Sequence, residues 1–349
     1  MQDLKNKLTI FHFITALESG GAEKILFETI RNTINEYDHK VIVLQKKGAY
    51  LKKLSSLGIT VKKVSFRLLF FLLQNRHRVL LHSYLYHSHV TSLLFKLVGC
   101  KVIWSIHSSV SPKSSSYYKL KFIGLLSHVV PEKIIFVSKL SRKQHSVFNF
   151  DKKKSIVIYN GVDLSIFDNN QCNLNINKEF INIGMISRYH HTKNFPKFIQ
   201  IARNVIHLNP NSHFFLIGKG NDCNNLDLIK KLEEYDLKKH TTLIGEVDNV
   251  QNLICCFDLL VSTSESESFG LTIIEAILSN VNVSTINLPI MDELFGAYSP
   301  NAGDKEDKEI AKVWLEKSKK KPDAGLMAYS RKYSLDKMIK SYKVIYNET

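Results

Sequence analysis

The sequence has 349 residues, of which 44% are hydrophobic and 23% are charged, so it contains enough apolar material for two domain cores. It has no run of about 18 apolar residues, which excludes an ordinary transmembrane helix, and its first residues do not form a signal-peptide pattern. The five cysteines show neither C-x-x-C spacing nor a paired-histidine spacing. We therefore expect no zinc site, and a reducing, cytosolic compartment fits best.

The formal net charge of +16 is concentrated in the first half of the chain. Residues 1–165 contain 26 Lys and Arg against 9 Asp and Glu, whereas residues 166–349 contain 22 against 23. A basic half favours an acidic partner, such as an anionic lipid surface, a lipid-linked pyrophosphate or a nucleic acid. The alternative is a lysine-rich surface that only keeps the protein in solution.

The first predicted strand, Lys7–Ile14, is followed by a turn that contains Gly20 and Gly21 and by a helix from Ala22. A strand, a glycine turn and a helix together let a phosphate approach the backbone. The turn has neither the G-x-G-x-x-G spacing nor the Walker spacing, so neither a dinucleotide site nor a P-loop is predicted. A simple tight turn is the alternative.

Strand and helix patterns then alternate, which indicates a parallel, doubly wound sheet. His107 and Ser138 each follow a predicted strand, at the sheet edge where ligands bind in such folds. The Ser- and Lys-rich segment Val110–Tyr118 is predicted to be a mobile loop through which an acceptor enters. The other predicted strands are His39–Leu44, Val61–Val64, Val79–His82, Lys101–Ile106, Lys133–Val137 and Ser155–Ile158, and the predicted helices are Tyr50–Leu57, Phe66–Asn75 and His89–Val98.

A turn at Tyr159–Asp163, which includes Asn160, ends the first half. The polar, Asn-rich segment Asp168–Lys178 follows it and is predicted to be an interdomain linker. We therefore predict a first domain of residues 1–165 and a second domain of residues 166–329.

The second half repeats the alternation of strands and helices. Arg188 and Lys193 lie in a strand-to-helix loop, where a pair of cations can clamp a diphosphate. Gly218 begins a Gly-Lys-Gly turn after the next strand, and the lysine-rich run Lys317–Pro322 is predicted to be a solvated turn. The predicted elements are strands Ile181–Ile186, His213–Ile217, Thr241–Ile244 and Phe257–Val261, a helix at Phe195–His207, and two helical pieces in Met327–Tyr346 that are broken at Tyr333.

The segment Val261–Ala276 combines the end of a strand, a loop rich in Ser and Thr, and the start of a helix. Gly270 allows a ligand close to the backbone, and the first helical N–H groups favour an anion. Glu267 in the loop and Glu275 in the helix are placed to face one crevice, and Glu265 is a rival to Glu267. The alternative is that these carboxylates only complement the helix dipole or lie in solvent.

These motifs, in this order, resemble the retaining glycosyltransferases of family 4, which have the GT-B fold of two Rossmann-like domains facing a central cleft. The resemblance covers nearly the whole chain, and Trp104–Ser108 is similar to the subset found in bacterial surface-polysaccharide pathways. The motifs are the Gly20-Gly21 turn, Asn160–Asp163, S-R-x-x-x-x-K-N at Ser187–Asn194, Gly218-Lys219-Gly220, and E-S-F-G-L-T-I-I-E at Glu267–Glu275.

The resemblance implies that the second domain binds a nucleoside-diphosphate sugar. Arg188 and Lys193 would neutralise the leaving diphosphate, Glu267 would accept hydrogen bonds from sugar hydroxyls, and Glu275 would hold the ribose. Ser268 stands where the family often has Gly, and Lys219 where an acidic residue is common. The backbone groups expected to contact sugar and phosphate belong to Phe269, Gly270, Leu271 and Thr272.

The same resemblance implies that the first domain binds the acceptor and that a C-terminal helix, about residues 330–349, packs back on it. Gly20 and Gly21 would approach the phosphate and acceptor, and His107, where relatives often carry Arg, would lie near the sugar. Ser138, Asn160 and Gly218 complete the set of predicted substrate contacts.

We therefore expect a retaining transferase that moves a hexose or N-acetylhexosamine to a lipid-linked saccharide. A UDP-sugar is the favoured donor and a GDP-sugar the next. No D-x-D motif is seen on the donor side, so no metal or other cofactor is expected. We expect a cytoplasmic protein on the inner face of the cell membrane, attracted by anionic lipid and not bound to nucleic acid. The alternatives are a noncatalytic protein that binds nucleic acid or a membrane surface, and a sugar-nucleotide epimerase of the same architecture.

Overall fold

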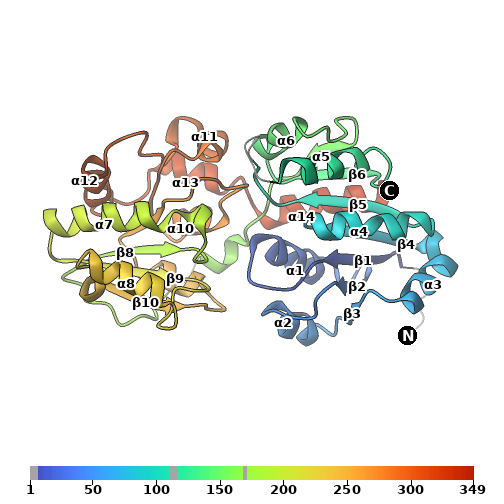
Figure 1. Ribbon diagram of the computed structural model, residues 1–349, viewed down its shortest axis with the longest axis horizontal. Helices are drawn as coiled ribbons and strands as arrows, with labels where there is room; N and C mark the ends of the chain where they lie inside the picture. Colours follow the sequence, from blue (N-terminus) through green and yellow to red (C-terminus); the bar gives the residue numbers. More distant parts are fainter. Residues whose placement is uncertain (1–6, 111–115, 168–170) are drawn as a thin grey trace. The chain divides into compact units, whose positions relative to one another are not determined.

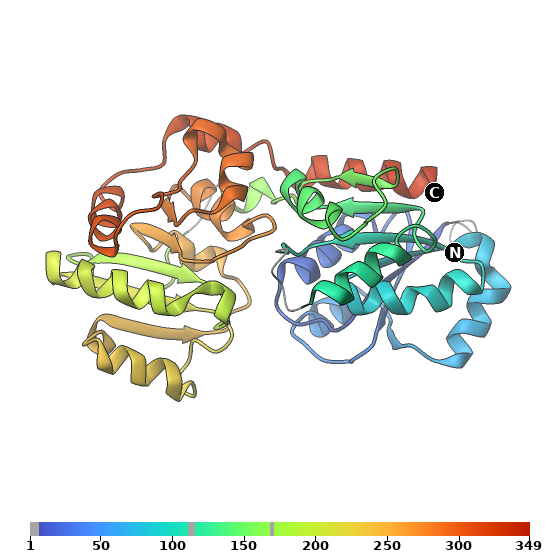
Figure 2. The ribbon, with the colours of Figure 1, turned by 45° about the horizontal axis from the view of Figure 1, so that its top comes forward.

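The structure is a computed structural model that describes residues 7–110, 116–167 and 171–349. The chain forms two compact units: unit 1 comprises Met1–Gly161 and Ser334–Thr349, and unit 2 comprises Val162–Tyr333. In each unit, helices lie on both faces of one sheet (Figures 1 and 2). The predicted class of two doubly wound parallel-sheet domains is confirmed. No helix in the described ranges is long and apolar enough to cross a membrane.

Unit 1 contains a seven-stranded sheet with the order β3-β2-β1-β4-β5-β6-β7, in which all paired strands are parallel. The order reverses between β1 and β4, which is the topological switch point of a doubly wound sheet. Its strands are β1 (Thr9–Ile14), β2 (Asp38–Val43), β3 (Val61–Lys63), β4 (Val79–Tyr84), β5 (Lys101–Ile106), β6 (Lys133–Phe136) and β7 (Ser155–Val157). Its helices are α1 (Gly21–Thr33), α2 (Tyr50–Ser56), α3 (Phe66–Asn75), α4 (Tyr86–Leu97), α5 (Tyr117–Leu126), α6 (Lys139–Ser146) and α14 (Leu335–Glu348).

The two faces of this sheet are buried under different helices, because alternate side chains of each strand point to opposite faces. On one face, Phe11 and Phe13 of β1 belong to a core cluster that includes buried side chains of α3, α4 and α5. On the other face, Ile14 belongs to a cluster with buried side chains of α1 and α2. The strands are accordingly apolar on both sides, as in other parallel sheets.

The C-terminal helix α14 belongs to unit 1, and the chain returns to this unit beside the point where it leaves. A Cβ at Gly161 would lie 2.5 Å from the Cα of Leu335, so only a glycine fits this close approach. The hydroxyl of Tyr346 lies 2.7 Å from Nδ1 of His82, which ties α14 to the central strand β4. The helix therefore completes the burial of the sheet face that it covers.

Unit 2 contains a five-stranded parallel sheet with the order β10-β9-β8-β11-β12. The order reverses between β8 and β11, and one core cluster joins the sheet to α7, α8 and α12. Its strands are β8 (Ile181–Ile186), β9 (Ser212–Ile217), β10 (Thr241–Gly245), β11 (Leu259–Ser262) and β12 (Asn282–Thr285). Its helices are α7 (Phe195–Leu208), α8 (Leu226–Glu234), α9 (Gln251–Ile254), α10 (Leu271–Leu278), α11 (Pro289–Phe295), α12 (Asp307–Lys317) and α13 (Ala324–Ser330).

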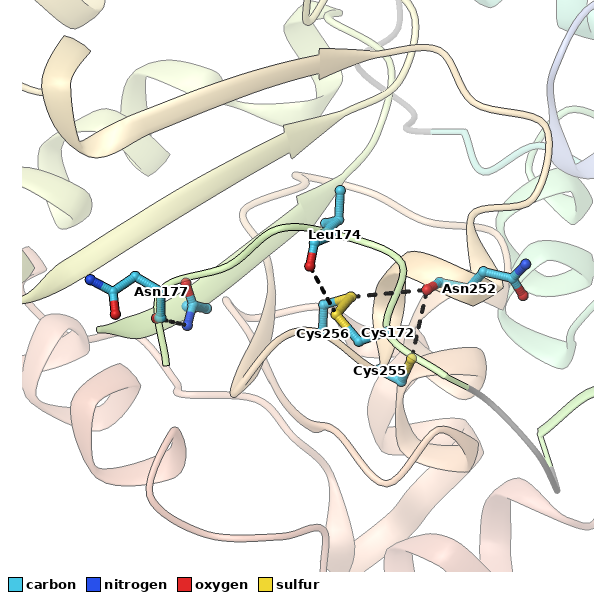
Figure 3. The surroundings of a disulfide bond; sticks show 7 residues. Cys172, Leu174, Asn177, Asn252, Cys255 and Cys256 are labelled. Atoms are coloured by element: carbon cyan, nitrogen blue, oxygen red, sulfur yellow. Dashed lines mark hydrogen bonds between the residues drawn. A yellow bond between two sulfur atoms is a disulfide. The ribbon is translucent and has the colours of Figure 1, made fainter. Parts of the chain in front are cut away.

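A disulfide joins Cys172, at the start of unit 2, to Cys256, just after α9 (Figure 3). Cys255 lies beside this bond and is a free thiol, as are Cys100 and Cys223. The bond departs from the reduced thiols that the sequence analysis expects. The residues are 84 positions apart, and sequence spacing alone contains no signal for such a pair.

One other expectation from the sequence needs correction at a single residue. Lys317 is not in a solvated turn: it ends α12, and its ammonium donates to the carbonyls of Val283 and Pro300, both at 3.0 Å. Burial lowers the pKa of Lys317 to about 8. The predicted acceptor loop Val110–Tyr118 lies largely outside the described residues, and its last two residues already belong to α5.

Candidate functional site

The strongest cluster of charged side chains in unit 2 lies where the strand order of its sheet reverses. Lys193 follows β8 and Glu267 follows β11, and the Lys193 Nζ lies 2.5 Å from Oε1 of Glu267. The two side chains are 18% and 22% exposed, so the pair is largely shielded but open to a ligand. This edge is where ligands bind in open parallel sheets.

Hydrogen bonds from the loop after β11 hold the loop after β8 in place. The Thr263 hydroxyl donates to the carbonyl oxygens of Lys193 and Asn194, at 2.9 and 3.1 Å. The Glu265 N–H donates to the carbonyl of Thr192 at 2.9 Å. The Ser264 hydroxyl donates to the same Glu267 oxygen at 2.9 Å. Lys193 and Glu267 are therefore positioned by their loops before any ligand arrives.

The structure separates the two rival glutamates of the loop. Glu267 contacts Lys193, whereas the Glu265 side chain is exposed and only its backbone contributes to the loop contact. This placement is consistent with the prediction that Glu267, rather than Glu265, is a contact in the site. The catalytic role of Glu267 stays a prediction.

Gly270 forms the N-terminal cap of α10 with a φ of 85°, in the left-handed region that favours glycine. A Cβ at this position would also lie 2.8 Å from the terminal methyl carbon of Met291. Leu271 and Thr272 are the first residues of α10, and their N–H groups have no acceptor within the helix. Phe269 is 1% exposed and its ring packs edge-on against Tyr333, so this side chain anchors the loop.

Glu275 is 1% exposed, which is rare for a carboxylate. Its Oε1 lies 3.5 Å from the Nε2 donor of Gln251 at the start of α9. Sequence reasoning did not identify Gln251, because nothing in its local pattern distinguishes it from a surface glutamine. Thr263 and Ser264 were also not assigned, although the Ser/Thr-rich run after β11 was a usable signal.

Arg188 and Gly218 lie on the same edge of the unit 2 sheet. Arg188 follows β8 and is exposed, and among the described residues it has no carboxylate partner within ion-pair distance. Gly218 follows β9 with a φ of 126°, and a Cβ there would lie 2.3 Å from the carbonyl oxygen of Ser187. The glycine therefore allows the loops after β8 and β9 to pack closely, with Tyr189 N–H donating to the Lys219 carbonyl at 2.8 Å.

In unit 1, the predicted contacts lie at the carboxyl edges of several strands. Gly20 caps α1 and Gly21 is its first residue, after β1. Ser138 caps α6 after β6, and its hydroxyl accepts the Ser141 N–H at 3.0 Å, so a capping function accounts for part of its role. Asn160 is buried, and its Oδ1 has no hydrogen-bond partner among the described residues.

His107 follows β5 and stacks on Tyr84, with ring centroids 5.7 Å apart. Burial lowers the pKa of His107 to about 3, so the imidazole is neutral at physiological pH. A neutral imidazole can donate or accept one hydrogen bond but cannot neutralise a diphosphate by charge. This property distinguishes His107 from the cations of unit 2.

A buried network of imidazoles and hydroxyls adjoins His107 within the sheet of unit 1. His12 Nε2 lies 2.9 Å from His39 Nδ1, and His12 Nδ1 lies 3.2 Å from the Tyr84 hydroxyl. That hydroxyl lies 2.9 Å from Nδ1 of His82, which also contacts Tyr346. Burial lowers the pKa of all three histidines, most strongly for His12 and His82, so the network is a neutral scaffold.

The chemistry available in unit 2 is recognition of an anion and of hydroxyl groups. A cation, an unpaired helix N-terminus and a carboxylate converge at one sheet edge, which suits a phosphate beside a polyol. Within the described ranges, no three His, Cys, Asp or Glu side chains gather as metal ligands. The expected absence of a metal stays a prediction.

Comparison with known proteins gives consistent matches over both halves. Residues 11–166 match the model of Glycosyltransferase Family 4, and residues 167–319 match that of Glycosyl transferases group 1. A capsular polysaccharide biosynthesis glycosyltransferase, CapH of Staphylococcus aureus, is 24% identical over 329 residues, which are 90% of each chain.

Two further proteins extend the comparison. A UDP-Gal:alpha-D-GlcNAc-diphosphoundecaprenol alpha-1,3-galactosyltransferase of Escherichia coli is 29% identical over 42% of this chain and 45% of its own length. The crystal structure of Anabaena HepE in complex with UDP and glucose superposes with a TM-score of 0.83 and 18% identity, covering 98% of this chain and 100% of HepE. That structural likeness establishes the shared GT-B fold.

Proposed function

Because the chain belongs to the glycosyltransferases that join a family 4 domain to a group 1 domain, we propose that it is a retaining, metal-independent transferase of surface-polysaccharide synthesis. It moves a hexose or N-acetylhexosamine from a UDP-sugar to a lipid-linked saccharide. The observation that carries this proposal is the Lys193–Glu267 pair at the switch point of unit 2. The S. aureus relative is named for capsule synthesis, which supports the same pathway class.

Cleavage of the donor glycosidic bond places negative charge on the leaving diphosphate. In the proposed mechanism, Lys193, Arg188 and the N-terminal N–H groups of α10 stabilise this charge as it develops. Because Lys193 is already fixed by Glu267 and Arg188 is accessible, little reorganisation is needed when the donor binds. Such preorganised electrostatics can replace a divalent metal, which is why we propose metal-independent transfer.

The carboxylate of Glu267 also has a second function in this proposal. It has a second oxygen with which to accept hydrogen bonds from donor sugar hydroxyls while Oε1 contacts Lys193 and Ser264. The buried Glu275 is proposed to hold the ribose, positioned by Gln251. Retention then follows from attack on the face from which the diphosphate leaves, with the departing phosphate accepting the acceptor proton.

UDP is the proposed donor nucleotide and a lipid-linked saccharide the proposed acceptor. HepE is described in complex with UDP and glucose, and the E. coli relative is named for a diphosphoundecaprenol acceptor. We propose that the enzyme reaches this acceptor from the cytoplasm, at the inner membrane surface, and the +16 net charge supports attraction to anionic lipid.

The first test is the melting temperature of the full chain with UDP, GDP, ADP and their sugars, each with and without EDTA. A ligand that binds only the folded state raises this temperature by mass action. We expect selective stabilisation by UDP or a UDP-sugar that EDTA leaves unchanged. If EDTA abolishes the shift, the metal-independent mechanism is wrong, and if no nucleotide shifts the transition, the donor site is wrong.

Product analysis then separates the transferase from its rival. With UDP-sugar alone, an epimerase of this architecture would convert the donor, whereas the transferase needs an acceptor. The anomeric configuration of the new linkage, measured by nuclear magnetic resonance, tests retention directly. Tight, strongly salt-dependent binding of RNA without any nucleotide response would instead favour the nucleic-acid alternative.

A further inference from the structure

The charge of unit 1 has an uneven distribution along the sequence. Between His39 and Pro131 the chain contains 15 Lys and Arg and no Asp or Glu. This stretch includes the three helices α3, α4 and α5, which cover one face of the sheet. Their outward surfaces therefore carry no carboxylate of their own to neutralise the positive charge.

The same helices expose an unusual amount of apolar surface. Sixteen large apolar side chains are exposed among the described residues, and ten of them lie between Phe66 and Val129. Scattered single exposures are normal, but a concentration on adjacent elements marks an interaction surface. The ten are Phe66, Phe70, Phe71, Leu73, Leu94, Leu97, Tyr118, Phe122, Leu125 and Val129.

Helix α3 shows most clearly that the sheet does not account for these side chains. Leu68 and Leu72 point into the core and are almost fully buried. Phe66 and Phe70, on the other side of the helix, are 91% and 62% exposed. A helix that only covers a sheet has a polar outer face, whereas α3 is apolar on both sides.

Helix α5 repeats this arrangement. Leu120 and Ile123 are buried against the sheet, while Phe122 and Leu125 are 53% and 58% exposed. Lysines are interleaved with these groups at positions 119 and 121, and both are exposed. On this surface, apolar groups and cations therefore alternate.

The exposed groups of the three helices form one surface. Buried side chains of α3, α4 and α5 belong to a single core cluster, so the helices cover the same face of the sheet (labelled in Figure 1). We call the ten exposed apolar side chains, with the exposed cations Arg67, Arg76, Arg78, Lys119 and Lys121, the α3–α5 surface. The nearest following carboxylate, Glu132, is paired with Lys96 at 2.5 Å.

We propose that the α3–α5 surface is the part of the protein that docks on an anionic phospholipid bilayer. Aromatic and aliphatic side chains enter the headgroup boundary, and the surrounding cations attract the anionic lipid. The inference rests on the proposed function, because a lipid-linked acceptor gives such docking its purpose. It adds to that function the surface and the residues that make the contact.

The position of this surface relative to the predicted acceptor residues fits the proposal. Helix α4 begins at Tyr86, directly after β4, and the Ser108 hydroxyl donates to the Tyr86 hydroxyl at 2.7 Å. Ser108 follows His107, so the first turn of α4 lies at the sheet edge that carries this residue. Helix α4 runs from that edge to the exposed Leu94 and Leu97 in its last turn, so one helix connects the α3–α5 surface to the predicted acceptor edge.

The charges on the surface disfavour two other occupants. A second copy of the chain would place the same surface against itself in a two-fold dimer, with cations facing cations and no carboxylates between them. A nucleic acid would satisfy the cations, but it offers no apolar layer to cover aliphatic groups such as Leu94, Leu97 and Leu125.

The test is co-flotation of the full chain with vesicles of phosphatidylcholine alone or mixed with phosphatidylglycerol. We expect binding to the mixed vesicles only, weakening as salt is raised. The double variant Phe66→Ser/Phe70→Ser should bind about tenfold more weakly, because two aromatic side chains leave the interface. Arg76→Ser/Arg78→Ser should bind about 25-fold more weakly, since each cation near an anionic surface contributes about fivefold.

The matched control is Val344→Ser on α14, which covers the opposite face of the same sheet and is 53% exposed. This variant should bind like the parent, and melting temperatures should be unchanged for all variants because the altered side chains are exposed. Equal vesicle binding by the parent and both double variants would overturn the proposal. A dimer in sedimentation that the Phe66→Ser/Phe70→Ser variant dissociates, or RNA that competes only with the parent, would also overturn it.

The proposed function is tested separately by the UDP-induced melting shift. Vesicle binding that depends on the α3–α5 surface, without a UDP shift, would leave the docking inference standing and reject the transferase. A UDP shift without surface-dependent vesicle binding would reject the docking inference alone.

Discussion

The two units have the same sheet pattern but handle polar groups differently at the switch point. In unit 2, the loops after β8 and β11 bring a cation and a carboxylate together, 2.5 Å apart and partly open to solvent. In unit 1, the strands contribute neutral imidazoles and phenols, such as His12, His82 and Tyr84, that are fully buried. The charged side chains lie where a charged ligand would bind. The neutral side chains lie inside the sheet, where they stabilise the fold.

This difference separates function from stability. Changes to the partly shielded Lys193–Glu267 pair of unit 2 should affect turnover with little effect on folding, whereas changes to the buried network of unit 1 should affect folding. Each unit contains one of the two tryptophans, Trp104 in unit 1 and Trp314 in unit 2, and both are fully buried. In the Trp314→Phe variant, the fluorescence of Trp104 therefore reports on unit 1. In the Trp104→Phe variant, the fluorescence of Trp314 reports on unit 2.

The largest expected effect is on catalysis. Lys193→Met and Glu267→Gln should each lower kcat/KM by about 10²–10³-fold, because each removes preorganised stabilisation of the transition state. The double variant should lose less than the product of the two, since the groups act as a unit. Steady-state kinetics measures kcat/KM for the single variants and for the double variant.

The control for this pair is the ion pair Lys320–Glu316 at the end of α12, at 2.6 Å and exposed. Lys320→Met and Glu316→Gln should leave kcat/KM unchanged. If the Lys193 and Glu267 variants keep the kcat/KM of these controls, the charged pair of unit 2 does not contribute to catalysis.

The next effect concerns the disulfide of unit 2. Reduction of Cys172–Cys256 should lower the free energy of unfolding of unit 2 by about 2–4 kcal/mol, because the bond closes a long loop in the unfolded chain. Urea unfolding of Trp104→Phe, with and without a dithiol reductant, measures this change. The exposed Cys223→Ser variant should show the same loss on reduction, whereas Cys172→Ser should show none.

Acidification should affect unit 1 more than unit 2. Burial lowers the pKa of His39 to about 4 from a usual 6.5, so the unfolded chain binds a proton more readily between these values. Stability is full above pH 6.5 and falls as the pH drops toward 4, by about 3 kcal/mol for this group alone. Urea unfolding of Trp314→Phe from pH 7 to 4.5 should show this loss. A free energy of unfolding that does not change with pH would contradict the neutral state of the buried histidines.

The smallest expected effect is at the contact between α14 and the sheet. Tyr346→Phe removes the hydroxyl that lies 2.7 Å from His82 and should lower the free energy of unfolding of unit 1 by about 1 kcal/mol. Tyr118→Phe, which alters an 84% exposed ring, is the matched control. Equal stabilities of the two variants would mean that the hydroxyl of Tyr346 contributes nothing measurable.

Much of the fold could be predicted from local patterns. The strands Lys101–Ile106 and Ile181–Ile186 and the helix Phe66–Asn75 agree with the structure residue for residue. The helices α5, α6, α8, α9, α11 and α12 and the strand β12 were not predicted, and some of these elements lack an apolar buried face. Helix α6, for example, buries only Ser141 and His145.

The candidate site was predicted in part. Lys193 and Glu267 were identified from the loops that contain them, since polar residues after buried strands gather at one sheet edge. Their direct pairing was not predicted, and neither were the contacts of Thr263 with the Lys193 loop or of Gln251 with Glu275. These contacts join residues about 24 to 74 positions apart.

The sequence by itself determined the class of fold, the two-domain division and the basic character of the first half, because periodicity, turn residues and charge are local properties of the chain. Only the tertiary structure decided which charges meet, which cysteines join and which apolar side chains remain uncovered. Phe66 and Leu68 are equally apolar in the sequence, yet one is 91% exposed and the other 8%. That difference depends on which side of α3 the sheet occupies, and only long-range packing sets it.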